Sequence, residues 1–275
     1  MDWIAAITQL RRDGVFGVLV TVTAVRGHAP RDAGAKMVVA ADHAWGTIGG
    51  GNLEECAVER AREMIDQGVR SAESTTSRLS AHERAKHGQQ CCGGEVELLL
   101  EPLPPRPTVA IFGVGHVGFE LARTLSRLEV QLHLVDSRTE QMDELRLASV
   151  TDGSADVVAH RVLLGEAVLE QLPAGSHVLI MTHDHAEDFA LCDAVLRRGD
   201  LGTVGLIGSS AKWSRFRSLL RAEGHSDSAI DGISCPIGDP SVAGKEPAVI
   251  AIGVAAELLR AFQRSPAGAQ HHAHH

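Results

Sequence analysis

The sequence predicts an α/β protein in which a small N-terminal α/β domain is followed by a domain built on a doubly wound parallel sheet. From Thr108 onward, short apolar runs alternate with helical segments, as in strand–helix–strand units with right-handed crossovers. A proline-rich stretch at 101–107 separates this alternation from the first part of the chain. Apolar residues make up 44% of the chain and aromatic ones only 3%, so the core must be mainly aliphatic, which suits helices packed on a parallel sheet.

The first domain is expected at 1–100. It opens with a segment whose apolar residues recur at helical spacing, and two β-rich runs follow. A helix then begins after a run of glycines, and a final run that alternates and then becomes apolar is typical of a closing strand. The expected elements are a helix at 2–12, strands at 15–25 and 36–41, a helix at 52–67 and a strand at 94–102.

The segment 101–107 reads EPLPPRP. Proline lacks a backbone N–H donor and clashes with the preceding turn of a helix, so it is excluded from helix interiors and from central strands. We therefore expect this segment to link the two domains.

The second domain is expected at 108–264, followed by a flexible, His-rich tail at 265–275. Its apolar runs are short, and each is followed by a helical pattern. Strands are expected at 108–115, 131–136, 156–160, 177–183 and 203–209, and helices at 116–128, 186–198, 210–222 and 246–263.

Charge and hydropathy exclude several classes of partner. The net charge is -9, whereas a nucleic-acid partner or an anionic membrane surface requires clustered Lys and Arg. No apolar run approaches the ~20 residues that span a bilayer. The first residues show no signal-peptide pattern, so we expect a cytoplasmic protein whose cysteines are reduced.

Glycines at 113, 115 and 118 form a G-x-G-x-x-G pattern between a predicted strand and a predicted helix. Asp136 ends the next strand, where an acid that binds a ribose would lie in a Rossmann-like domain. Gly113, Gly115 and Gly118 would let the backbone approach a phosphate at a helix N-terminus. The alternative is that the pattern serves only a tight strand–helix turn.

Two further groups follow predicted strands, at the edge where doubly wound sheets hold ligands. His183, Asp184 and His185 lie in the stretch THDHAED and could form a metal site or an acid–base pair. Capping of the next helix by Asp184 or His185, or a generic ligand contact, is favoured over a metal site. Ser209, with Ser210 and Lys212, could contribute to a second anion site.

Three consecutive glycines, Gly49, Gly50 and Gly51, precede the helix at 52–67 in the first domain. Ordering glycine is entropically costly, and close contact between the backbone and an anionic ligand would explain so many of them. Arg31 and Lys36 could add positive charge. The alternative is a sharp bend against a neighbouring strand.

Two adjacent cysteines, Cys91 and Cys92, precede two glycines. Structural zinc is disfavoured because adjacent cysteines rarely share a metal and no second pair completes the site, and a vicinal disulfide would be strained. A thiolate at Cys92 could bind a soft metal or carry sulfur. Cys56 and Cys192 fall within predicted helices and are expected in the core.

The ordered motifs APR…GAKM, GTIGGGNLE, CGG, FGVGHVG, THDHAED and GLIGS resemble the xanthine dehydrogenase accessory factor family, XdhC and the related CoxI, over about 19–260. The resemblance implies a chaperone that binds the molybdenum cofactor and helps a cysteine desulfurase to sulfurate it. Such a chaperone then delivers the cofactor to the molybdenum subunit of apo xanthine dehydrogenase. It also implies that Cys92 contacts molybdenum or sulfur, while GKEPAV near the end departs from the family's Gly-Lys-Thr-Pro-Glu-Glu run.

Two other functions remain open at this level. The glycine pattern with Asp136 also fits an NAD(P)-dependent oxidoreductase, although no catalytic triad is visible and an accessory or carrier protein is favoured over an enzyme. A regulatory or scaffold protein would keep the fold and bind a partner instead. A homodimer is compatible with the sequence.

Overall fold

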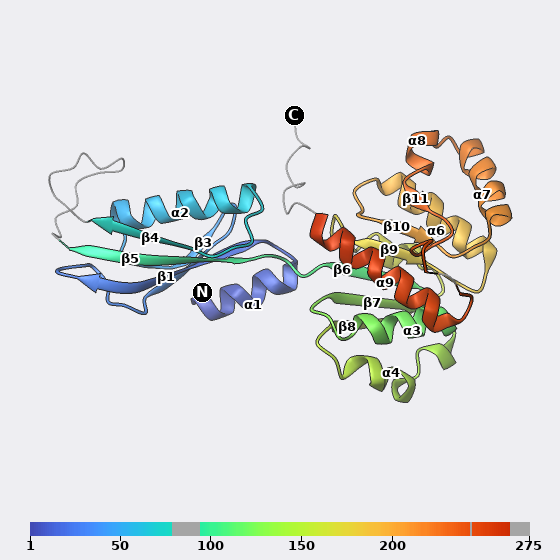
Figure 1. Ribbon diagram of the computed structural model, residues 1–275, viewed down its shortest axis with the longest axis horizontal. Helices are drawn as coiled ribbons and strands as arrows, with labels where there is room; N and C mark the ends of the chain where they lie inside the picture. The colour runs from blue at the N-terminus through green and yellow to red at the C-terminus, as the bar shows by residue number, and fades with distance from the viewer. Residues whose placement is uncertain (79–93, 243, 265–275) are drawn as a thin grey trace. The chain divides into compact units, whose positions relative to one another are not determined.

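The computed structural model describes residues 1–78, 94–242 and 244–264, and it divides into two compact units between Pro105 and Arg106 (Figure 1). Each unit has its own sheet and its own hydrophobic core. The predicted tail at 265–275 lies outside the described residues. In the described part of the chain, no helix combines the length and apolar character needed to cross a membrane.

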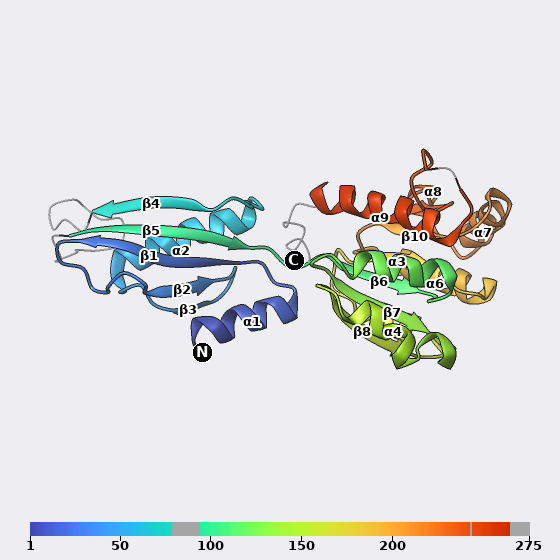
Figure 2. The same cartoon turned by 60° about the horizontal axis from the view of Figure 1, so that its bottom comes forward.

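The first unit is built on an antiparallel sheet that has five strands over the described residues, in the order β3-β2-β1-β5-β4 (Figure 2). Its elements are α1 (Trp3–Asp13), β1 (Gly17–Arg26), β2 (Lys36–Val39), β3 (Ala44–Gly46), α2 (Gly51–Asp66), β4 (Glu73–Arg78) and β5 (Glu95–Leu103).

Helices cover both faces of this sheet (Figure 1). Successive side chains of a strand point to opposite faces, so Met37 and Val39 join the core with α2, whereas Val38 and Ala40 pack with α1. The predicted small N-terminal α/β unit is therefore confirmed, with the added detail that its sheet is antiparallel.

Strand β5 continues into the proline-rich segment. Pro102 pairs with Val18 of β1, so 101–103 are strand, whereas the prolines were expected to keep 101–107 out of central strands. The physical reason is that β4 begins at Glu73, which pairs with Leu100, so β4 does not run beside residues 101–103 of β5. Beyond that point β5 has a neighbour on one side only, and proline is tolerated at such an edge.

The second unit contains a parallel sheet whose six described strands run in the order β11-β10-β9-β6-β7-β8. This is the doubly wound Rossmann order, with the topological switch point between β6 and β9. The predicted Rossmann-like sheet is confirmed. The elements are β6 (Thr108–Phe112), α3 (His116–Leu125), β7 (Gln131–Asp136), η1 (Thr139–Gln141), α4 (Glu144–Thr151), β8 (Asp156–Arg161), α5 (Glu166–Leu169), β9 (His177–Ile180), α6 (His185–Arg198), β10 (Val204–Leu206), α7 (Ser210–Ala222), α8 (Asp227–Ile230), β11 (Ile233–Ser234) and α9 (Pro247–Arg264).

The central strand β6 is buried along its whole length. Val109 and Ile111 face the core shared with α3, α4 and α9, and Ala110 and Phe112 face the core shared with α5, α6, α7 and α8. Burial on both faces explains why this strand reads as a continuous apolar run. It also places the loop that follows β6 at the centre of the carboxyl edge of the sheet.

Candidate functional site

The loops after β6 and β9 meet at the switch point of the second unit. Gly113 has φ +99°, and its N–H donates to Val135 O at 2.8 Å. A Cβ at Gly113 would lie 2.2 Å from Met181 O, at the end of β9. Only glycine fits both the backbone angle and this approach. The close packing brings the glycine loop beside the THDHAED stretch.

The other two glycines of the pattern have different roles. A Cβ at Gly118 would lie 2.1 Å from Gly113 O, so this glycine allows α3 to pack closely on the loop. At Gly115 the nearest atom to such a Cβ is Nη2 of Arg138, at 3.8 Å, so the backbone here is accessible to a ligand. These roles are those of the three glycines in a dinucleotide-binding turn.

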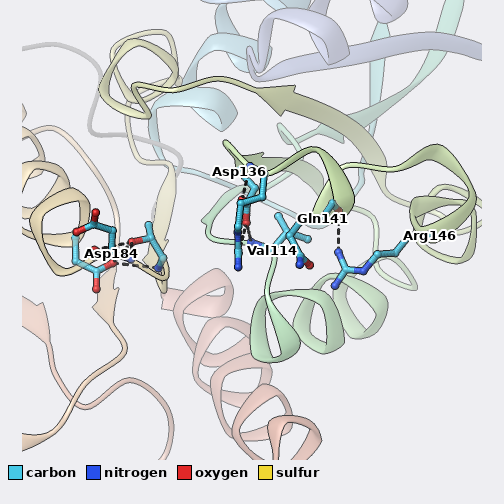
Figure 3. Close-up of polar contacts among 8 residues, drawn as sticks. Val114, Asp136, Gln141, Arg146 and Asp184 are labelled. Carbon is cyan, nitrogen blue, oxygen red and sulfur yellow. Dashed lines mark hydrogen bonds and ion pairs between the residues drawn. The ribbon is translucent and has the colours of Figure 1, made fainter.

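Asp136 is almost fully buried at the end of β7, and its carboxylate is occupied within the protein (Figure 3). Oδ2 accepts from Val114 N at 2.7 Å and from Arg138 Nη2 at 2.7 Å, while Oδ1 accepts from Arg138 N at 3.0 Å and Arg138 Nε at 2.9 Å. Four donors fill the acceptor sites of a carboxylate. Asp136 therefore joins the loops after β6 and β7. In this arrangement neither carboxylate oxygen is left to accept the hydrogen bond that was expected from a ribose hydroxyl.

Electrostatics agree with that geometry. Burial raises the pKa of Asp136, but the hydrogen bonds from Arg138 and Val114 outweigh burial and bring the pKa below its usual value. Arg138 was not identified from the sequence, although its position two residues after the strand-ending acid is a usable signal. The carboxylate is thus charged near neutral pH and holds Arg138 beside Gly115.

The THDHAED stretch begins α6. Asp184 is the N-cap, since its side chain accepts from Ala186 N at 2.7 Å, and His183 and His185 are exposed. Figure 3 shows Asp184 on one side of Val114 and Arg146 on the other. No group of three or more metal-ligating side chains occurs among the described residues. Capping, one of the two alternatives at this position, is the role that the structure shows for Asp184.

A further carboxylate, Glu187, lies in the first turn of α6 and was not identified from the sequence. Burial is the main cause that raises its pKa; His183 and a hydrogen bond with Thr182 lower it, while the charges of Asp136 and Asp188 raise it. Glu187 thus adds a carboxylate with a raised pKa whose charge acts on Arg138 and interacts with Asp136.

Ser209 and Lys212 lie at the start of α7, and their polar groups are used within the fold. Ser209 is the N-cap and accepts from Lys212 N at 3.2 Å. Lys212 Nζ forms a buried ion pair with Asp188 Oδ2 and donates to Ile207 O at 3.1 Å. Asp188 also accepts from Thr182 N at 3.0 Å. The lysine charge is therefore neutralised, which weakens the expected second anion site.

In the first unit, Gly49, Gly50 and Gly51 all have positive φ, at +128°, +74° and +62°. A Cβ at Gly49 would lie 2.5 Å from Pro30 Cγ, whereas a Cβ at Gly50 or Gly51 would meet nothing within 4 Å. Glu54 Oε2 accepts from Ile48 N at 3.1 Å and from Gly50 N at 3.0 Å. An internal carboxylate thus takes part of the anion-binding capacity expected for this turn.

The other residues of this unit that were predicted to form a site do not all lie near the glycine turn. Arg31 is exposed, and its Cγ would lie 3.4 Å from a Cβ at Gly49, so it adjoins the glycine turn. Lys36 donates to Thr21 Oγ1 at 3.0 Å and lies over the Trp3 ring, on the face covered by α1. Cys91 and Cys92 lie outside the described residues.

The cysteines that the structure describes differ in their exposure to solvent. Cys192 is buried, as predicted, and burial is the main cause that raises the pKa of its thiol to about 12. Cys56 is exposed, so its expected place in the core is wrong. The buried stripe of α2 runs through Leu53, Ala57 and Ala61, and Cys56 falls beside it.

Comparisons with known proteins agree with the two-unit fold. A family profile described as the XdhC Rossmann domain matches residues 109–258, and a profile of the XdhC and CoxI family matches residues 10–75. Over 251 residues the chain is 29% identical to the uncharacterized protein YqeB of Escherichia coli (strain K12). The aligned region covers 88% of this chain and 43% of YqeB. The chain thus spans less than half the length of this curated relative.

Two solved structures are similar at low identity. One is described as a xanthine dehydrogenase from Bacillus halodurans, with 19% identity, 98% coverage of both chains and a TM-score of 0.49. The other is the E. coli tRNA N6-threonylcarbamoyladenosine dehydratase, with 13% identity, 57% of this chain, 87% of that chain and a TM-score of 0.43. The profile matches, which cover more than half of the chain, establish that it belongs to the XdhC and CoxI family.

Proposed function

We propose that this protein binds the molybdenum cofactor as cargo, protects it, supports its sulfuration by a cysteine desulfurase and delivers it to apo xanthine dehydrogenase. Family membership supports an XdhC-like accessory role in general. The cargo, the two partners and a role as a carrier without turnover are the specific parts of the proposal.

The observation that carries the proposal is the packing at one end of the first sheet. The turn after β1 contacts two separate segments: a Cβ at Gly94 would lie 2.2 Å from His28 O, and a Cβ at Gly49 would lie 2.5 Å from Pro30 Cγ. Gly94 follows Cys92 by two positions in the sequence. One turn therefore joins the glycine run to the residue that immediately follows the CCG stretch.

The chemistry of these groups suits the proposed cargo. The cofactor has a soft metal–sulfur centre, a polar pterin and a phosphate, and a cysteine thiolate is a ligand that soft metals prefer. The open space beside Gly50 and Gly51 leaves backbone accessible to a ligand. We propose that Cys92 contacts the metal–sulfur end and that Gly49–Gly51 and Arg31 border the bound pterin.

The test is co-purification under anaerobic conditions from cells with an intact cofactor pathway. Molybdenum is measured by mass spectrometry and pterin by fluorescence after oxidation. We expect both in the wild-type protein, a loss in Cys92→Ala, and retention in Cys56→Ala, a matched control because Cys56 is an exposed cysteine on α2. Absence of both from the wild type would refute the proposal, and a damaging Cys91→Ala with a silent Cys92→Ala would refute the assignment of the thiol.

An NAD(P)-dependent oxidoreductase is the second candidate, favoured by the Rossmann strand order and the glycine loop. The four donors on the Asp136 carboxylate oppose it, since the ribose hydroxyls would have to displace one of them. Titration with NADH decides this point: the oxidoreductase requires affinity that falls in Asp136→Ala, and the absence of affinity removes this candidate.

A further inference from the structure

A cavity of about 310 Å³ lies in the second unit, between α9 and the strands β9, β10 and β11. Its apolar walls come from Leu179 of β9, Ile237 after β11, and Val254 and Leu258 of α9. None of the residues that line it belongs to the glycine loop after β6 or to the THDHAED stretch. The cavity is therefore separate from the candidate site at the switch point.

The sequence of β10 explains why this space is open. Val204 and Leu206 belong to the core that α7 and α8 cover, so strand alternation turns Gly205 toward the face that carries α9. Gly205 has no side chain to fill that face, and a Cβ there would lie 2.7 Å from Ile237 Cδ1. The floor of the cavity is thus backbone rather than side chain.

Two residues of the lining carry charge, Glu257 and Arg260. Arg260 is neutralised by Asp239, whose Oδ2 accepts from Arg260 Nη1 at 2.6 Å. Hydrogen bonds from Ser241, and then the one from Arg260, hold the pKa of Asp239 at about 2, so that its carboxylate is charged near neutral pH. Glu257 is half-buried and has no hydrogen bond or ion pair with any residue that the structure describes. Its carboxylate is therefore available to a ligand in the cavity.

The hydroxyl of Thr203, which also lines the cavity, is suited to accept a hydrogen bond from a ligand. Nδ1 of His177 lies 3.3 Å from Thr203 N and 2.8 Å from Thr203 Oγ1. Burial lowers the pKa of His177, so the ring is neutral near neutral pH. Because Nδ1 accepts from the Thr203 amide, it holds no proton, and the Thr203 hydroxyl donates to it. Oγ1 then keeps its lone pairs for a donor on a ligand.

We propose that this cavity binds a small primary amine with an apolar body, held as an ammonium ion by Glu257 and Thr203. An ammonium group has three donors and no acceptor, which matches a carboxylate without a counterion and a hydroxyl that can only accept. Hydrogen bonds between charged groups are roughly twice as strong as neutral ones, so the charge of the ligand decides its affinity. Small-molecule sites measure about 300–1,000 Å³, and a cavity at the lower end suits a single ring or a short chain.

Glu257→Gln is the informative variant, because glutamine keeps the shape of the side chain and removes its charge. Glu120→Gln is the matched control: Glu120 lies on α3, pairs with Arg123 at 3.3 Å and does not line the cavity. Ala261→Phe fills the cavity from α9. Thermal unfolding of each variant checks that the fold is intact, and the comparison of the two glutamine variants is decisive even if Ala261→Phe fails to fold.

Four probes are titrated into the isotope-labelled full chain and followed by the NMR shifts of backbone amides: phenethylamine, phenethyl alcohol, hexylamine and hexanol. Each amine is paired with the neutral alcohol of the same shape. We expect at least one amine to bind about tenfold more tightly than its alcohol and to shift the amides of Gly205 and Ser234, which line the cavity. Glu257→Gln should reduce this preference to about twofold or less, Glu120→Gln should leave it unchanged, and Ala261→Phe should prevent binding.

Three results would overturn the proposal. The first is equal binding of each amine and its alcohol, or no binding of any probe. The second is a preference for the amine that persists in Glu257→Gln. The third is binding that leaves the amides of Gly205 and Ser234 unshifted, which would place the amine elsewhere. The proposed carrier function stands in all three cases, because it is argued from the first unit.

Discussion

Replacing Asp136 by Asn tests whether this carboxylate joins the loops of the glycine turn. Asn has the same shape, but one oxygen becomes an NH₂ group that must face donors. Whichever oxygen is replaced, two hydrogen bonds are lost: those from Val114 N and Arg138 Nη2, or those from Arg138 N and Nε. In the first case the loop after β6 loses its hydrogen bond to the end of β7, and in the second case Arg138 loses two of its three hydrogen bonds to Asp136.

The magnitude follows from burial. The side chain of Asp136 is 2% exposed and that of Arg138 is 26% exposed. Hydrogen bonds to charged groups contribute about 1.5–3 kcal/mol each, and breaking a buried ion pair costs about 3–5 kcal/mol. Because Arg138 remains partly hydrated, we expect the lower end, a loss of about 3 kcal/mol in the free energy of unfolding of the second unit. Asp156→Asn, at a pair whose carboxylate is 69% exposed, should cost less than about 1 kcal/mol.

The assay is urea unfolding followed by the fluorescence of Trp213, which is buried in the second unit. The chain contains three tryptophans, so Trp3→Phe and Trp45→Phe in the background make Trp213 the sole reporter. Hydrogen exchange at the Val114 amide provides a local measurement and should accelerate in Asp136→Asn. A loss no larger than that of Asp156→Asn, with unchanged exchange, would refute the role assigned to Asp136.

Three further predictions concern other parts of the structure. Glu54→Ala should cost about 1–3 kcal/mol in chemical unfolding of the first unit, because it leaves two amides of the glycine turn without their acceptor; unchanged unfolding would contradict this role. Asp188→Asn should cost about 3–5 kcal/mol, and Lys212→Met added to it should recover part of that loss, which a double-mutant cycle measures; a further loss would argue against the buried pair. Burial first, and then the neighbouring His160, lower the pKa of His133 from 6.5 to about 4; the unfolded chain therefore binds this proton first as the pH falls, and the free energy of unfolding should fall by about 1–2 kcal/mol between pH 7 and pH 5. His133→Phe should flatten that dependence, and a slope equal to that of the wild type would show that other groups cause it.

Local patterns predicted the position of the glycine loop but not its contacts. The spacing of Gly113, Gly115 and Gly118 between a strand and a helix is a backbone requirement, and it is visible in the residue types themselves. Arg138 donates hydrogen bonds to Asp136, and these bonds depend on the direction that the side chains take after β7 ends. The motif that predicts Asp136 as a ribose ligand contains no information on those side-chain directions. The parallel, doubly wound sheet, by contrast, could be predicted from the alternation of strands and helices with right-handed crossovers.

In the first unit too, the sequence predicted the backbone feature but not the side-chain contacts around it. Glycines at 49–51 indicate positive φ. The glycine run does not reveal that Glu54, in the first turn of α2, accepts from the amides of Ile48 and Gly50. Lys36 was grouped with Arg31 by sequence proximity, whereas strand alternation places it on the face that packs with α1. Cys56 could have been placed correctly, because the helical spacing of Leu53, Ala57 and Ala61 already excludes it from the buried stripe.

The most direct test of the carrier function is transfer to the recipient enzyme. Protein purified anaerobically with its cargo is mixed with cofactor-free xanthine dehydrogenase, and active sites are counted against the molybdenum supplied. The proposal predicts activation by the loaded protein and little activation by an equal amount of Cys92→Ala protein prepared in parallel. Activation that is the same with both proteins, or with neither, would contradict it.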